Sequence, residues 1–178
     1  MKHCAIITWN INGLLLNFKE LVSIINMLNP DVVCLQETKC STPFPNIDDY
    51  ECFESPYERF QHHGVCIYAK KFLNPEPIIT NNKFPGRLVV LKLNNGATVT
   101  SVYVQNSEQK DIERQTFDKL FWEEIERIYV PKTQFIIAGD LNTCLTPADD
   151  YSGKLDPKKP ARKPYEIESL KAGICKFN

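Results

Sequence analysis

Three apolar runs of the sequence each end in a polar side chain of the kind that holds a metal ion or a phosphate. They are Ala5-Ile6-Ile7-Thr8-Trp9 before Asn10, Val32-Val33-Cys34-Leu35-Gln36 before Glu37, and Phe135-Ile136-Ile137-Ala138-Gly139 before Asp140 and Asn142. Carboxylate and amide oxygens are hard ligands, which suit Mg²⁺ or Mn²⁺. The repetition predicts one site, formed where the ends of several strands converge.

Asp140 and Asn142 stand two residues apart after an apolar run and a glycine. Side chains two apart on a strand point the same way, so we expect the carboxylate and the amide to face one pocket. Beside a phosphate, the carboxylate could orient or deprotonate a water, and the amide could hold a phosphate oxygen. The alternative interpretation is an Asx turn at the end of a strand, with no chemistry.

The other strand ends also have two interpretations. Glu37 either holds the metal or forms a surface ion pair with Lys39. Asn10 and Asn12 precede Gly13, and this segment could equally be a turn, because Asn tolerates the left-handed conformation.

Tyr103 and Asn106 end a further predicted strand. The phenol could donate to a phosphate, although a strand tyrosine is more often simply packed. His63 lies just before another strand, and we interpret it as an exposed loop histidine.

Strands and helices that position these residues follow from periodicity and from turn residues. Strands are predicted over 3–9, 32–36, 50–54, 64–69, 87–93, 98–104 and 134–138, and helices over 17–29, 108–129 and 165–174. Single strands, hairpins and intervening helices predict an α/β sandwich with mixed sheets. A right-handed crossover through the first helix would place Asn10 and Glu37 at the same sheet edge.

Composition is that of a globular chain. The 178 residues are 43% hydrophobic and 24% charged, with a formal net charge of −1. This charge argues against a globally basic nucleic-acid binder, but it does not exclude a nuclease that relies on a metal. No apolar run is long enough to span a bilayer. Seven cysteines without zinc spacing, and an N-terminus that enters a strand directly, predict an intracellular protein of the nucleus or cytoplasm rather than a secreted one.

Five motifs in this order resemble the endonuclease/exonuclease/phosphatase superfamily: TWNINGL, PDVVCLQETK, GVCIYAK, VTSVYVQN and IIAGDLNT. Within it they are most similar to abasic-site (exonuclease III-like) endonucleases and to the endonuclease domain of LINE-type retrotransposons. The NING form and the segment NTCLTPADDYSG favour the retrotransposon branch. The resemblance covers about residues 6–153. It implies a four-layer α/β sandwich of the DNase I-like type, as a single domain over 1–178.

The resemblance implies that Glu37 is the ligand of Mg²⁺ (or Mn²⁺) and that Asn10 supports the metal–phosphate site. Asn12 would bind the phosphate or substrate, in a position where abasic-site enzymes often have Asp.

By the same resemblance, Tyr103 and Asn106 contact the scissile phosphate. Asp140 orients or activates the attacking water, and Asn142 binds a phosphate oxygen. Gln105 stands where the family usually has Pro, a departure that alters the rigidity of the loop.

The implied function is that of a Mg²⁺-dependent phosphodiesterase that nicks DNA, with DNA as the partner and no membrane. The family's C-terminal Ser-Asp-His motif is not found after Asn142, so we expect an N-terminal portion of the domain, or part of a polyprotein with a reverse transcriptase. One alternative is a catalytically impaired, truncated relic or nucleic-acid-binding module. Another is a phosphatase of the superfamily that acts on a small phosphoester. The basic run over 154–163 either tracks a nucleic-acid backbone or is a solvated loop.

Overall fold

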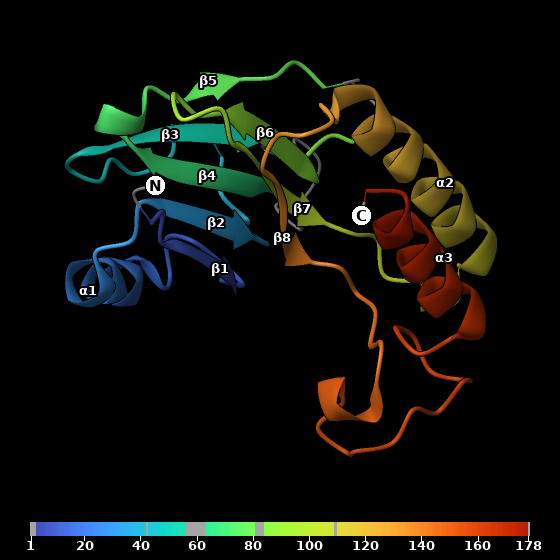
Figure 1. Ribbon diagram of the computed structural model, residues 1–178. Helices are drawn as coiled ribbons and strands as arrows, with labels where there is room; N and C mark the ends of the chain where they lie inside the picture. Colours follow the sequence, from blue (N-terminus) through green and yellow to red (C-terminus); the bar gives the residue numbers. More distant parts are fainter. Residues whose placement is uncertain (1–2, 42, 56–62, 81–83, 109, 178) are drawn as a thin grey trace. The chain divides into compact units, whose positions relative to one another are not determined.

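The computed structural model describes residues 3–41, 43–55, 63–80, 84–108 and 110–177 (Figure 1). The chain divides into two compact units. The first comprises Met1–Tyr103 and Lys132–Asp140, and the second comprises Val104–Pro131 and Leu141–Asn178. The single domain expected over 1–178 stays a prediction.

Two four-stranded sheets make up most of the first unit, with strand orders β1-β2-β4-β3 and β5-β6-β7-β8. The strands are β1 Ile6–Asn10, β2 Val32–Gln36, β3 Tyr50–Ser55, β4 Val65–Lys70, β5 Glu76–Pro77, β6 Leu88–Lys92, β7 Thr98–Tyr103 and β8 Phe135–Asp140. The seven strands predicted from the sequence are therefore confirmed. The two-residue β5 was missed, because Pro77 is atypical of a strand.

The first strand, β1, is parallel to β2, and helix α1 (Phe18–Leu28) connects them. Their register pairs Asn10 with Gln36, which places Asn10 and Glu37 at the same edge, as predicted. The last two strands of the second sheet, β7 and β8, are also parallel, and they pair Tyr103 with Asp140. Parallel pairing thus brings the polar ends of neighbouring strands to the same end of each sheet.

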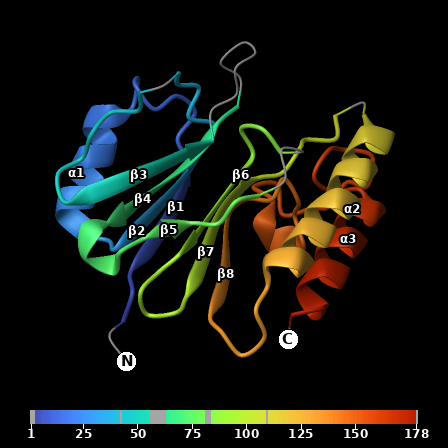
Figure 2. The ribbon, with the colours of Figure 1, turned by 90° about the horizontal axis from the view of Figure 1, so that it is seen from above.

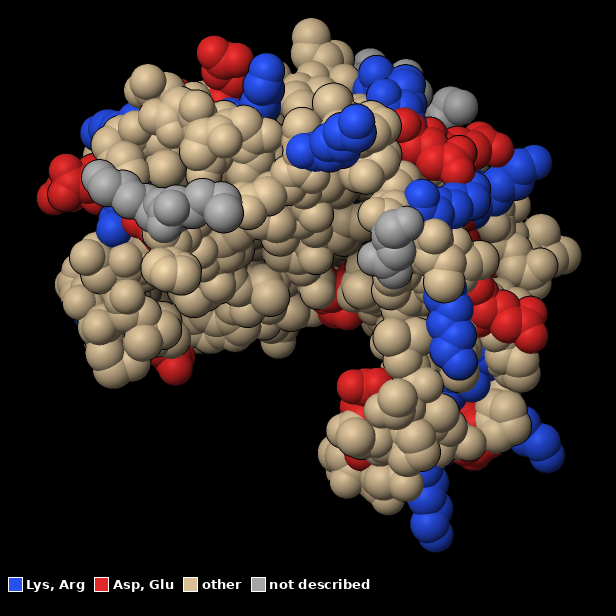
Figure 3. Space-filling model, viewed as in Figure 1, with Lys and Arg blue, Asp and Glu red and all other residues tan. Residues whose placement is uncertain are grey.

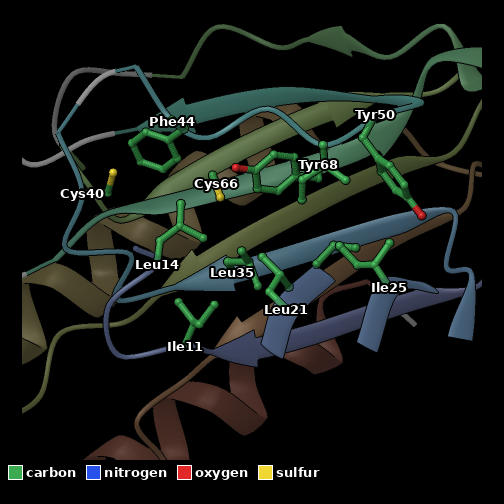
Figure 4. Packing of buried hydrophobic residues seen from close by; sticks show 12 residues of the cluster. Ile11, Leu14, Leu21, Ile25, Leu35, Cys40, Phe44, Tyr50, Cys66 and Tyr68 are labelled. Carbon is green, nitrogen blue, oxygen red and sulfur yellow. The ribbon is translucent and has the colours of Figure 1, made fainter. Parts of the chain in front are cut away.

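Alternating side chains of β2 serve two apolar cores. Val33 and Leu35 pack against Leu21 and Ile25 of α1, in the cluster of Figure 4. The side chains on the other face of β2, such as Val32, pack in the core that includes residues of the second sheet. Figure 2 shows α1, the first sheet and the second sheet as successive layers of this unit. A strand that is buried on both faces explains why the β2 sequence is almost continuously apolar.

The second unit contains helices α2 (Asp111–Ile128) and α3 (Pro164–Cys175), and a 3₁₀ turn at Pro147–Asp149. Phe121 and Trp122 of α2 are buried, as is Leu170 of α3. Apolar Ile112 of α2 is 82% exposed, whereas the buried face of the helix includes charged residues. The predicted helix began at 108, but α2 begins at Asp111, and residue 109 lies outside the described part of the chain.

None of the described helices is both long and apolar enough to cross a bilayer. All seven cysteines are free thiols.

Candidate active site

Four of the predicted residues meet at the strand ends of the first unit. The side-chain amide of Asn10 donates to Glu37 Oε1 and to Asp140 Oδ2, with both distances 2.9 Å. The phenol of Tyr103 donates to the same Glu37 Oε1, also over 2.9 Å. We call Asn10, Glu37, Tyr103 and Asp140 the strand-end cluster.

The second oxygen of Glu37 forms an ion pair with Lys39, at 3.0 Å between Nζ and Oε2. Lys39 also donates to Asn12. Burial raises the pKa of Glu37, but the hydrogen bonds from Asn10, Lys39 and Tyr103 lower it by more, so this pKa lies below its ordinary value. The ion pair of Glu37 with Lys39 is therefore confirmed, whereas its role as a metal ligand stays a prediction.

Tyr103 is the other member whose proton affinity is shifted. Burial raises its pKa, and the hydrogen bond to Glu37 raises it further. The phenol therefore keeps its proton and remains a donor at neutral pH.

Unusual backbone conformations place these side chains. Glu37 and Asn12 have φ angles of 49° and 47°, a left-handed conformation that Asn12 tolerates but that costs Glu37 about 1–2 kcal/mol. The two turns are joined by backbone hydrogen bonds from Gly13 N to Glu37 O and from Leu14 N to Thr38 O. Such strain persists because its surroundings fix it, and it is typical of functional sites.

Gly139 allows β8 to approach β7 directly before Asp140. Its φ is +141°, and a Cβ atom there would lie 2.0 Å from the carbonyl oxygen of Val102. Only glycine fits this position, so the close approach fixes where Asp140 leaves the sheet.

A buried amide lies next to the cluster. Gln36 is 1% exposed, and its Nε2 donates to Thr8 Oγ1 at 3.2 Å and to Ser101 Oγ at 3.1 Å. It therefore joins β1 and β2 of one sheet to β7 of the other. Gln36 ends an otherwise apolar run, and a polar amide at that position is a sequence signal of this kind of link.

Arg87 and His63 also lie against the cluster. The guanidinium of Arg87 stacks over the Tyr103 ring at 5.1 Å, and it donates to the Tyr103 carbonyl at 3.1 Å. The His63 ring is 5.7 Å from the Tyr103 ring and 3.2 Å from Arg87, between Nε2 and Nη2. The prediction of an exposed loop histidine was wrong, because His63 is half-buried against Tyr103. His62 lies outside the described residues.

Two predicted residues belong to the second unit. The amide of Asn142 donates to the Val104 carbonyl at 2.8 Å, and the amide oxygen of Asn106 accepts from the backbone of Glu108. Strand β8 ends at Asp140, and Asn142 has a φ of 45°. Asn142 therefore lies beyond the strand, where side chains need not alternate, and its phosphate-binding role stays a prediction.

Two basic side chains of the run over 154–163 are paired with acidic ones. Arg162 and Lys163 form ion pairs with Asp150 and Asp111. Figure 3 shows Lys and Arg interspersed with Asp and Glu over the second unit. This arrangement favours the interpretation as a solvated loop.

The donor set of the strand-end cluster fits a hard divalent cation. The carboxylates of Glu37 and Asp140 both accept a hydrogen bond from the Asn10 amide nitrogen. A cation beside two neighbouring carboxylates would stabilise both negative charges. Within the described ranges, no group of three or more His, Cys, Asp or Glu side chains could hold a metal. The two carboxylates of the cluster would suit a cation that keeps water and phosphate among its ligands.

Known proteins resemble this chain in sequence and in fold. Residues 7–162 match the Endonuclease/Exonuclease/phosphatase family. The chain belongs to this family. It is 30% identical to recombination repair protein 1 of Drosophila melanogaster, over 89% of this chain and 24% of that protein. It is 27% identical to an exodeoxyribonuclease of Bacillus subtilis (strain 168), over 77% of this chain and 58% of that protein.

A solved structure establishes the fold. The AP endonuclease LMAP from Leishmania major matches with a TM-score of 0.82 and 22% identity, over 98% of this chain and 67% of that one. The predicted fold class is confirmed. The resemblance to abasic-site and exonuclease III-like enzymes is confirmed at the level of the family. The chain spans between 24% and 58% of the two curated relatives named. These relatives do not support the retrotransposon branch, which stays a prediction.

Proposed function

We propose that this chain carries the metal- and phosphate-binding residues of a Mg²⁺-dependent phosphodiesterase of the DNA endonuclease type. The observation that supports the proposal best is the convergence of Asn10, Glu37, Tyr103 and Asp140 on one point. An exodeoxyribonuclease and an abasic-site endonuclease are among the relatives of the family.

Each member of the cluster has a role that its contacts favour. Glu37 is held ionised by its donors and would bind the cation, with Asn10 beside it. When bound, Mg²⁺ supplies positive charge against the phosphate and the leaving oxygen. The protonated phenol of Tyr103 would donate to a phosphate oxygen.

Asp140 would orient the attacking water and take its proton, while the amides of Asn106 and Asn142 would donate to phosphate oxygens. In the reaction a water oxygen bonds to phosphorus, and the bond from phosphorus to one sugar oxygen breaks. Asn12, whose side chain accepts a hydrogen bond from Lys39, would contact the phosphate or the substrate.

Nicking of supercoiled plasmid and cleavage of a duplex with one abasic site, with and without Mg²⁺, test the proposal. Glu37→Ala should lower the rate by on the order of 10²-fold or more, and Asp140→Asn by about 10²–10⁴-fold. Glu51→Ala is the matched control, because Glu51 is exposed on β3. If neither substrate is cut, or if Glu37→Ala behaves as Glu51→Ala does, the proposal is wrong.

The same preparations separate the alternatives. A nucleic-acid-binding module would bind labelled duplex in fluorescence anisotropy and leave it intact. A phosphatase of the superfamily would release inorganic phosphate from a small phosphoester such as an inositol phosphate, in a manner that Glu37→Ala abolishes.

A further inference from the structure

A buried arginine in the second unit binds two chain segments that carry proposed site residues. Arg114 lies in the first turns of α2 and is 2% exposed. Its Nε donates to Asp118 Oδ1 at 2.7 Å, and its Nη1 lies 3.3 Å from Glu166 Oε1. Glu166 is fully buried. We call Arg114, Asp118 and Glu166 the Arg114 network.

The terminal nitrogens of Arg114 also donate to two other segments of the chain. Nη1 donates to the carbonyl of Gln105 at 2.8 Å and to that of Asn142 at 3.2 Å. Nη2 donates to Thr143 Oγ1 at 2.9 Å and lies 3.5 Å from the Leu141 carbonyl. One side chain thus holds the segment that follows β7 and the segment that follows β8.

A second contact joins the same two segments. The Asn142 side chain donates to the Val104 carbonyl, while its own carbonyl accepts from Arg114. Asn142 has a φ of 45°, a left-handed conformation that asparagine tolerates, and its contacts stabilise it there. Arg114 supplies that stabilisation from one side and Val104 from the other.

We propose that Arg114 is the positioning residue that fixes Asn142 for phosphate binding, a role that rests on the proposed function. No other residue type reproduces its contacts. Arginine presents donors on three nitrogens in a planar fork, whereas lysine has one nitrogen on a flexible stem. Lysine can therefore keep the buried charge beside Asp118 and Glu166, but it cannot span both segments.

Arg114→Lys is accordingly the test variant, because it avoids the uncompensated buried carboxylates that a neutral residue would leave. Arg127→Lys is the matched control, since Arg127 lies on the same helix and pairs with Glu124 at 2.7 Å with a half-exposed side chain. Plasmid nicking with Mg²⁺ should show a kcat about 10- to 100-fold lower for Arg114→Lys. KM should change less, and Arg127→Lys should match the wild type.

A double-mutant cycle separates positioning from general loss of structure. If Arg114 acts through Asn142, Arg114→Lys should have little further effect in an Asn142→Ala background. An equal fall in kcat in both backgrounds, or no fall at all, would overturn the inference.

Amide hydrogen exchange tests the positioning role of Arg114 independently of activity. In Arg114→Lys the amides of 105–106 and 141–143 should exchange faster, while the amides of β1 and β2 and all those of Arg127→Lys remain as in the wild type. Unchanged exchange in 105–106 and 141–143 refutes the role of Arg114. An inactive wild type with this exchange pattern refutes the proposed function alone and supports the positioning role.

Discussion

The strand-end cluster and the Arg114 network hold their side chains by different means. In the cluster, backbone ladders carry Asn10, Glu37 and Asp140 to the same end of their sheets, and side-chain hydrogen bonds need only complete the arrangement. In the network, Arg114 itself ties irregular segments together. A regular sheet positions residues through register, whereas irregular chain depends on single side chains.

Two carboxyl groups show the same contrast in their electrostatics. Burial raises the pKa of Glu37, yet three donors bring it below its ordinary value. Burial also raises the pKa of Asp118, and here the charge and hydrogen bond of Arg114 do not reverse the shift. Ionised Glu37 therefore stabilises the folded protein, whereas ionisation of Asp118 costs free energy that Arg114 only partly offsets.

The largest expected difference between the two units is the loss of stability when one glycine in each is replaced by alanine. Gly139→Ala brings a Cβ atom to 2.0 Å from the backbone of β7 at positive φ, and should lower the free energy of unfolding by on the order of 3 kcal/mol. Gly173→Ala meets the Trp122 side chain instead. Its overpacking is offset by about 1 kcal/mol of helix propensity.

Chemical denaturation of both variants measures the difference. Gly139→Ala should be the less stable protein, and it should also lose nicking activity because Asp140 follows directly. Equal losses would mean that the register of β8 is not what holds the cluster.

The sequence predicted the first unit far better than the second. The limits of β2 and the shared edge of Asn10 and Glu37 follow from apolar periodicity and turn residues, which are local signals. The partners of Gln36, and those of Arg114 other than Asp118, could not be predicted, because they lie on other segments of the chain and periodicity carries no information about them. The expectation that Asn142 points the same way as Asp140 has no basis in the structure, because β8 ends two residues before Asn142.

Removal of the Gln36 amide should have a smaller effect that spreads to the cluster. Gln36→Leu leaves the Thr8 and Ser101 hydroxyls without this partner, and should lower the free energy of unfolding by about 1–2 kcal/mol. Gln115→Leu is the matched control, since Gln115 is exposed on α2. Thermal denaturation should separate the two variants, and nicking by Gln36→Leu should weaken because Glu37 is the next residue. A variant as stable and active as the control would show that packing alone joins the two sheets.

The smallest expected effect is on the pH dependence of stability, whose sign should differ between Glu37 and Asp118. The lowered pKa of Glu37 contributes stability that is present above the ordinary value of 4.5 and is lost as the pH falls through the folded-state pKa. The deficit of Glu37→Gln relative to the wild type should therefore shrink in acid. The raised pKa of Asp118 works in the opposite direction, because the neutral form is favoured in the folded protein and stability is lost as the pH rises through that pKa. The stability of the wild type relative to Asp118→Asn should therefore increase in acid. Urea denaturation of the three proteins between pH 3 and pH 7 measures both slopes, and slopes of the same sign would contradict the assignment of one carboxyl to a donor-rich edge and the other to a desolvated interior.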